Sequence, residues 1–133
     1  MSAAGPVPAD AGGRDRMVAS MCAAVDRGDA EGFASWFAED ARYRFGNGEA
    51  TIGRSAVVAA TEGAANSLPW VRHTVDQVAH VGDQLFCRFT ISTADPAGSE
   101  VDLPCVTVIW IEHDEIVDYQ VTMDLAPAFS MAG

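Results

Sequence analysis

The chain has 133 residues, enough for one domain with one hydrophobic core, and 49% of them are hydrophobic. Nineteen acidic residues against eight basic ones give a formal net charge of -11. This charge argues against binding to nucleic acid or to an anionic membrane surface, because both need a basic protein surface.

Helices are predicted first along the chain. Residues 1–13, mostly Ala, Gly and Pro, are predicted to be a flexible tail before a single domain at 14–129, with a short tail at 130–133. From Arg14 the apolar residues recur at helical spacing and predict a first helix, which Gly28 can end. Asp29 can cap a short second helix. Its apolar positions, at spacings of three and four, are Phe33, Trp36 and Phe37.

Strands dominate the rest of the sequence. "DARYRFG" and "EATIG" predict two short strands, and a third helix is expected from about Arg54 to Ala65. Beyond it, "WVRHTVDQVAHV", "QLFCRFTISTA", "EVDLPCVTVIWIE" and "EIVDYQVTMD" alternate and are rich in Val, Ile, Thr and aromatic residues. Turns at residues 81–83 and 113–115 suit hairpins.

This order predicts an α+β fold in which N-terminal helices close a strongly curved, mostly antiparallel sheet into a cone. The interior of such a cone is a natural pocket for a hydrophobic small molecule. "CVTVIWI" is apolar on both faces, so its outer face needs a cover. We expect a homodimer packed through the sheet.

The remaining features of the sequence set the environment. Cys22, Cys87 and Cys105 lie in apolar runs without a CxxC pair and are predicted to be buried free thiols in a reducing compartment. No run is long enough to span a membrane and no signal pattern begins the chain, so a cytoplasmic location is expected. No residues show metal-ligand spacing or a nucleotide-binding glycine pattern, so no metal or cofactor is expected.

The chain resembles a known family over about residues 14–129. The segments "AVDRGDAEGFASWFAEDARYRF", "GRSAVVAA", "RHTV" and "EIVDYQVTMDLAPAF" are similar to the SnoaL-like branch of the nuclear-transport-factor-2-like (NTF2-like) superfamily. The resemblance implies the NTF2-like cone fold. The branch includes polyketide cyclases, limonene epoxide hydrolases, ketosteroid isomerases and scytalone dehydratases, and the same pocket also serves plain binding.

Three of these families are matched poorly at their catalytic positions. Those of the ketosteroid isomerases fall at Met21, Phe45 and about Val106, and those of the epoxide hydrolases at Phe89, Ile91 and Val121. The acid/base Asp of the polyketide cyclases also falls at Val121. All these residues are apolar here, which argues against a direct copy of those mechanisms.

The scytalone dehydratases are matched in part. Their helix Asp corresponds to Asp26 and their strand His to His73, whereas their second His falls at Phe89 and a tyrosine position at Phe45. The resemblance therefore implies an Asp26–His73 pair.

The residues themselves also favour this pair. His73 lies on the alternating face that runs from Val71 to Val81, and Asp26 follows the buried-stripe residue Cys22 by one helical turn. A carboxylate beside an imidazole fixes its tautomer and favours its charged form, so the pair can give and take a proton. The alternatives are that His73 is a core residue and that Asp26 is a solvated helix-end residue.

The pocket wall is predicted from strand alternation. Tyr119, Val121 and Met123 share one face, and we expect Phe89, Ile91, Phe45 and Trp36 to join them. Tyr119 is the best further polar candidate, because its hydroxyl can orient a substrate carbonyl or hydroxyl. Gln77 is a weaker candidate. His80, on the face opposite His73, and His113 are predicted to be solvated. Asp40 is predicted to be a turn residue before the first strand, and Asp124 to be structural and to cap the C-terminal segment. The alternative is a closed apolar core.

Two functions follow from these observations. The first is a cofactor-independent SnoaL-like cyclase, dehydratase or isomerase that acts on an apolar, oxygenated molecule such as a polyketide-type intermediate. In it, His73 is the general acid/base, Asp26 orients it and Tyr119 holds the substrate. The second is a non-catalytic module that binds a hydrophobic ligand or dimerises, which the apolar replacements favour.

Overall fold

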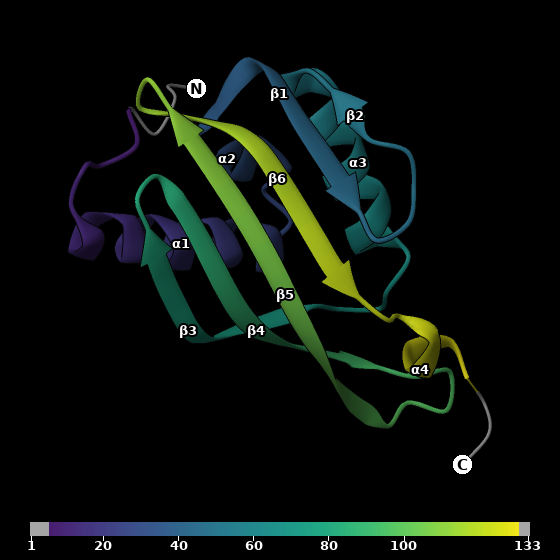
Figure 1. Cartoon of the computed structure of the whole chain (residues 1–133). Coiled ribbons are helices and arrows are strands. Elements are labelled where there is room, and N and C mark those ends of the chain that lie inside the picture. The colour runs from purple at the N-terminus through teal and green to yellow at the C-terminus, as the bar shows by residue number, and fades with distance from the viewer. Residues whose placement is uncertain (1–5, 131–133) are drawn as a thin grey trace.

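The computed structural model describes residues 6–130 (Figure 1). Its elements, in chain order, are α1 (Ala11–Asp26), α2 (Ala30–Ala34), β1 (Phe37–Phe45), β2 (Thr51–Ile52), α3 (Arg54–Asn66), β3 (Arg72–Val81), β4 (Gln84–Ala94), β5 (Glu100–Glu112), β6 (Glu115–Met123) and α4 (Ala126–Phe129). None of the helices in this range is long and apolar enough to cross a membrane.

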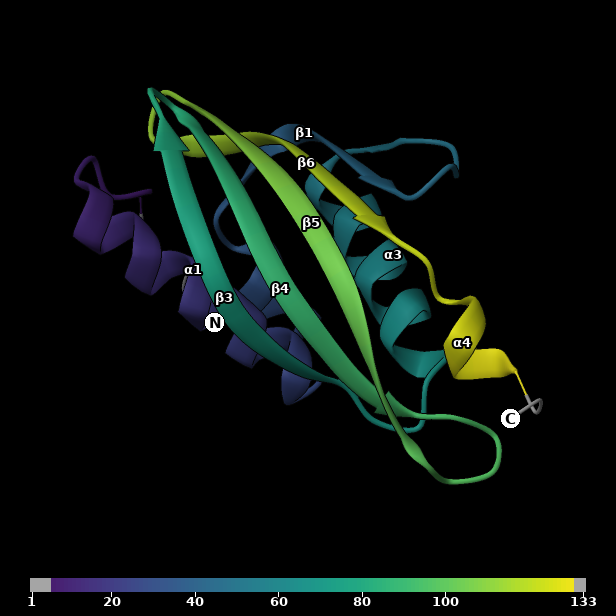
Figure 2. The ribbon, with the colours of Figure 1, turned by 60° about the horizontal axis from the view of Figure 1, so that its bottom comes forward.

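The strands form one mixed sheet in the order β2-β1-β6-β5-β4-β3. β1 and β6 are parallel, and every other neighbouring pair is antiparallel. Figures 1 and 2 show α1, α2 and α3 on one face of this curved sheet, with the other face uncovered. The α+β prediction is confirmed, and the covered face holds the core.

α1 starts earlier than predicted. Residues 11–13, assigned above to the flexible tail, form its first turn, because the Asp10 side chain accepts a hydrogen bond from the Gly13 backbone N–H at 2.8 Å and caps the helix. Val7 is also buried, and its N–H donates to the Asp114 carbonyl at 2.8 Å. This part of the tail therefore packs against the domain, while residues 1–5 and 131–133 lie outside the described range.

The second helix is shorter than its apolar spacing predicted. It is capped by Asp29 as expected, but it ends at Ala34, so Trp36 lies in a turn and Phe37 begins β1. Pairing with β6 accounts for the difference, since Phe37 is in register with Ile116, whose N–H donates to the Trp36 carbonyl at 3.0 Å. Strand pairing has overridden a local helical pattern here.

β3 contains a β-bulge that reverses its alternation. Val75 pairs with Phe89 and Gln77 with Arg88, so Asp76 is the extra residue. Before the bulge His73 faces the helices, and after it His80 does. The prediction that placed Gln77 on the His73 face and His80 on the opposite face is therefore wrong beyond the bulge. His80 Nε2 lies 2.8 Å from Asp15 Oδ1 of α1.

Two further predictions are confirmed. The turn residues Gly82, His113 and Asp114 have φ values of 58°, 52° and 62°, as tight hairpins require. All three cysteines are buried free thiols. Burial raises the pKa of Cys22 and of Cys87 to about 12 and also raises that of Cys105.

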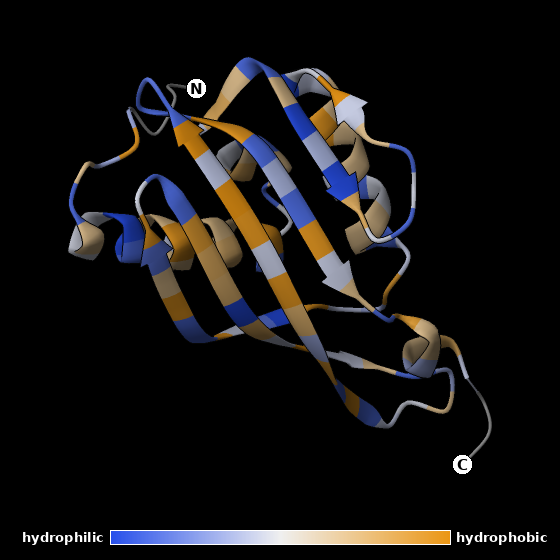
Figure 3. Cartoon of the chain, viewed as in Figure 1, coloured by the Kyte–Doolittle hydropathy of each residue, from blue (hydrophilic) through white to orange (hydrophobic). Residues whose placement is uncertain are grey.

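The uncovered face of the sheet carries exposed apolar side chains. Figure 3 shows hydrophobic positions along most of β5, whereas hydrophilic ones dominate β1. Phe86, Val106 and Trp110 of β4 and β5 are 39%, 44% and 37% exposed. An apolar patch on an otherwise acidic chain marks a surface suited to contact with another molecule.

Candidate active site

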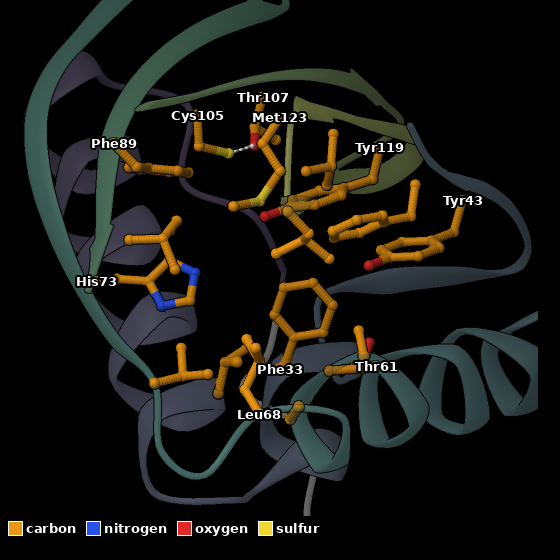
Figure 4. Close-up of a pocket in the computed structure, with 18 residues that line it drawn as sticks. Phe33, Tyr43, Thr61, Leu68, His73, Phe89, Cys105, Thr107, Tyr119 and Met123 are labelled. Atoms are coloured by element: carbon orange, nitrogen blue, oxygen red, sulfur yellow. Dashed lines mark hydrogen bonds between the residues drawn. The ribbon is translucent and has the colours of Figure 1, made fainter. Parts of the chain in front are cut away.

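A cavity of about 80 Å³ lies between the covered face of the sheet and the helices (Figure 4). Six of the predicted wall residues line it, namely Phe45, Phe89, Ile91, Tyr119, Val121 and Met123. His73 lines it as well. Leu68 and Val71, in the segment between α3 and β3, and Leu125 complete the apolar wall. The cavity is smaller than the roughly 300–1,000 Å³ of pockets for drug-sized ligands.

Trp36 is a predicted wall residue that the structure places elsewhere. It lines a separate surface hollow with Pro8, Asp10 and Met17, at the start of α1. The prediction failed because it put Trp36 on a helical face with Phe33, whereas the second helix ends before it. Trp36 therefore does not belong to this cavity.

Asp26 holds His73 through both of its carboxylate oxygens. Oδ1 lies 2.6 Å from His73 Nδ1, and Oδ2 accepts the His73 backbone N–H at 2.8 Å. The side chains are only 16% (His73) and 23% (Asp26) exposed. Because two hydrogen bonds run to one carboxylate, both the backbone and the ring of His73 are fixed in place.

This arrangement sets the tautomer of His73. An ionised carboxylate only accepts hydrogen bonds, so in neutral His73 the proton sits on Nδ1 and Nε2 keeps its lone pair. Figure 4 shows the imidazole reaching from β3 into the cavity. The ring edge meets Phe89 with centroids 5.8 Å apart. A free basic nitrogen thus faces an apolar chamber.

The local sequence explains the pairing. Asp26 is the last residue of α1, on the turn that follows the buried residues Met21 and Cys22. α1 lies along β3, and His73 precedes the bulge, so its side chain faces the helix. Ile91 of β4 is in register with His73 and continues the apolar wall of the cavity on the neighbouring strand.

Tyr119 supplies a hydroxyl on the opposite side of the cavity. Its ring stacks on Tyr43 with centroids 5.6 Å apart and meets the edge of Phe33 at 5.3 Å. Burial raises the pKa of Tyr119 well above its ordinary value. The hydroxyl therefore stays protonated at neutral pH and acts as a hydrogen-bond donor.

The sequence analysis missed three polar wall residues, namely Tyr43, Thr61 and Thr107. Tyr43 and Thr61 both line the cavity and are each 5% exposed. Tyr43 has the same strand parity as Phe45, which was predicted, so alternation alone could have found it. Thr61 follows the buried Val57 of α3 by one turn, and a polar residue on a buried stripe was the available signal.

The other polar residues take structural roles. Asp124 is structural, as predicted, since its side chain accepts the Ala126 N–H at 2.9 Å and holds the start of the C-terminal segment, although the N-cap position of α4 itself is Leu125. Asp40 is exposed within β1 rather than in a turn before it. Among residues 6–130, no three His, Cys, Asp or Glu side chains are grouped so that they could hold a metal ion.

Comparisons with known proteins identify the family and the fold. The profile of the family described as "SnoaL-like domain" matches residues 18–119. No curated protein matches the sequence at a significant level.

Solved structures show the same fold. A protein from Catenulispora acidiphila with a ketosteroid isomerase-like fold, in complex with trimethylamine, shares 18% identity at a TM-score of 0.72, covering 82% of this chain and 85% of its own. A candidate SnoaL-like polyketide cyclase from Jannaschia shares 20% at 0.72, covering 90% and 94%. An NTF2-like protein of unknown function from Burkholderia pseudomallei shares 20% at 0.74, covering 85% and 92%. The fold is NTF2-like, as predicted.

Proposed function

Because the chain belongs to the SnoaL-like domain family, we propose that it is an enzyme that moves protons on a small, apolar, oxygenated molecule, with His73 as general acid and base. The observation that carries the proposal is the double hold of Asp26 on His73, at 2.6 Å and 2.8 Å, which leaves Nε2 free beside the cavity. A merely structural histidine in an apolar wall needs no such support.

The chemistry proceeds in two proton transfers. Nε2 takes a proton from a carbon next to a substrate carbonyl, or from a hydroxyl, and the imidazolium that forms is stabilised by the Asp26 carboxylate. The Tyr119 hydroxyl donates a hydrogen bond to the oxygen on which negative charge develops. His73 then returns the proton to another substrate atom. Isomerisation, loss of water and ring closure all follow from this sequence, without a cofactor.

The cavity limits the substrate. Its walls are apolar, and no Lys or Arg lines it, so a neutral molecule fits better than an anion. A volume of about 80 Å³ favours a single ring or short chain over a polyketide-type intermediate of several fused rings. A larger substrate requires the cavity wall to move.

Proton exchange tests the function without knowledge of the natural substrate. In D₂O, the wild type should speed hydrogen–deuterium exchange next to the carbonyl of phenylacetone, followed by NMR. His73→Asn should lower the rate by about 10²- to 10⁴-fold, the usual contribution of a positioned acid/base. His80→Asn is the matched control and should leave the rate unchanged. Equal rates in wild type and His73→Asn would contradict the proposal.

A binding module without catalysis is the second candidate. It is favoured by the apolar side chains of Phe45, Phe89, Ile91 and Val121, which line the cavity at positions that the resemblance matches to catalytic residues of other families in the branch. In that case His73→Ala keeps ligand affinity, and no exchange is seen even in the wild type.

We also propose that two copies pair through the uncovered sheet face. Phe86, Val106 and Trp110 form the apolar centre, and Arg88 is in register with Val106. Asp102 lies near Arg88 in a hollow on this face, so a two-fold copy can set opposite charges against each other. Sedimentation at micromolar concentration should give twice the monomer mass of 14.0 kDa. A monomer would contradict the pairing.

A further inference from the structure

One polar atom in the cavity wall has no partner. Thr61 Oγ1 is fully buried and makes no hydrogen bond within the described residues. A buried hydroxyl left unpaired lowers the stability of the fold. An unpaired buried hydroxyl on a cavity wall can serve to bind a ligand, whose polar atom then becomes its hydrogen-bond partner.

Thr61 is not alone at its end of the cavity. Figure 4 shows the Tyr43 hydroxyl directed toward Thr61, on the side of the cavity away from His73. Burial raises the pKa of Tyr43 to about 12, and interaction of its hydroxyl with the Thr61 side chain offsets part of that rise. The two hydroxyls are thus close to each other, but they do not meet the geometry of a hydrogen bond in this structure. Tyr43 is thus a neutral donor at physiological pH. The two hydroxyls converge from α3 and β1.

The surroundings of this pair are apolar. Phe33, Val121 and Leu125 line the same cavity, and its wall has no charged side chain other than the paired His73. An oxygen placed between the two hydroxyls would accept a hydrogen bond or donate one, since each hydroxyl can do either. An anion would find no compensating positive charge there.

We propose that Thr61 and Tyr43 form a second binding subsite, which holds a neutral oxygen at the end of the ligand remote from His73. The proposal deepens the proposed function and rests on it for the role of the first oxygen. The substrate class is then a small neutral molecule, one ring in size, with two oxygen groups on opposite ends. One is presented to His73 and Tyr119, and the other to Thr61 and Tyr43.

A size-matched pair of probes tests the subsite. Hydroquinone carries two hydroxyls across one ring, and 4-methylphenol has a methyl group in place of the second. Affinities for both, measured by ¹⁵N–¹H shift titration under reducing conditions, give a ratio for each protein variant. Thr61→Val should lower the preference for hydroquinone by about 2- to 10-fold, the range of one net hydrogen bond. Affinity for 4-methylphenol should not fall.

Two control variants distinguish the loss of the Thr61 hydrogen bond from a general change in the packing of the cavity wall. Thr61→Ser keeps the hydroxyl and should retain the wild-type ratio. Thr107→Val alters another buried cavity threonine, whose Oγ1 already lies 3.7 Å from Cys105 Sγ, and should also retain it. Thr61→Val should unfold at the same temperature as the wild type or higher, because it removes an unpaired polar atom.

The outcomes are distinct from those of the exchange assay. Phenylacetone has one oxygen, so its exchange rate reports on His73, whereas the preference for hydroquinone over 4-methylphenol reports on Thr61. A preference that is equal in wild type and Thr61→Val overturns the subsite and leaves the role of His73 standing. Absence of binding of both probes to the wild type overturns the substrate class. A loss of thermal stability in Thr61→Val also overturns the subsite, because the Thr61 hydroxyl would then have a structural role.

Discussion

α1 and β3 are joined by two His–Asp pairs that are alike in composition and different in setting. Asp15 and Asp26 are eleven residues apart, about three helical turns, so both carboxylates lie on one face of α1. Asp15 meets His80 through Nε2 at 2.8 Å, and Asp26 meets His73 through Nδ1 at 2.6 Å. The pairs differ in the nitrogen that is left free. Only His73 turns its Nε2 toward an enclosed apolar space.

The surroundings of the two carboxylates differ as well. Asp15 is 53% exposed and has one partner, whereas Asp26 is 23% exposed and also accepts the His73 backbone N–H. Water competes with the first pair and is largely kept from the second. A His–Asp pair therefore indicates a functional site only when its free nitrogen has a cavity to act in.

The largest expected contrast is in rate. Asp26→Asn should lower phenylacetone exchange by about 10- to 100-fold, less than loss of the whole acid/base contribution, because the imidazolium loses its carboxylate while the imidazole remains. Asp15→Asn should leave the rate within about two-fold. NMR detection of the protonated ring nitrogen should place the proton of neutral His73 on Nδ1 in the wild type. Equal losses in both variants would remove the distinction between the pairs.

The next contrast is in stability. Asp26→Ala leaves the half-buried His73 backbone N–H without its partner and should cost about 1–3 kcal/mol in the free energy of unfolding. Asp15→Ala removes an exposed ion pair and should cost about 0–1 kcal/mol. Urea unfolding of both variants measures the difference. A larger cost for Asp15→Ala would mean that the outer pair, and not the inner one, holds α1 on the sheet.

The smallest contrast is expected at alkaline pH, where the two regions should respond alike. Cys22 lies near Asp26 and Cys87 near Asp15, and burial is the main reason that both thiol pKa values rise to about 12. Each thiol has a higher pKa in the folded protein than in the unfolded chain. Its contribution to the free energy of unfolding is therefore fully present below about pH 9 and is lost as the pH rises toward 12.

At pH 10, each of the two buried thiols should lower the free energy of unfolding by roughly 1 kcal/mol relative to pH 8. Cys22→Ala and Cys87→Ala should therefore flatten the loss of melting temperature between pH 8 and 10 to the same extent. A larger effect for Cys22→Ala would show that the inner carboxylate, rather than burial, controls the thiol.

Local patterns predicted most of the fold because helix stripes and strand alternation are local properties. These local patterns predicted the apolar stripe of α1, the Asp29 cap and the hairpin at His113. Trp36 was misplaced because a parallel pairing with β6, about eighty residues away, decided where β1 begins. The Asp26–His73 pair was predicted by its residues and by the resemblance, but its bond lengths depend on tertiary packing.

Thr61 could not be predicted as a binding residue from the sequence. A single threonine on an apolar helix stripe usually bonds its own backbone, and only the packed structure shows that its hydroxyl is left unpaired. The same is true of the cavity volume, which depends on how the side chains of α3 and β6 meet. Amino-acid composition determines neither the unpaired Thr61 hydroxyl nor the cavity volume.

The bulge at Asp76 affects how relatives can be aligned with this chain. On either side of it, inward-facing positions of β3 fall on odd and then on even residue numbers, as His73 and His80 illustrate. A relative with an uninterrupted strand needs a one-residue gap at this point. Without that gap, its residue matched to His80 would lie on the uncovered face of the sheet, and the inward-facing positions would be aligned correctly only as far as Val75.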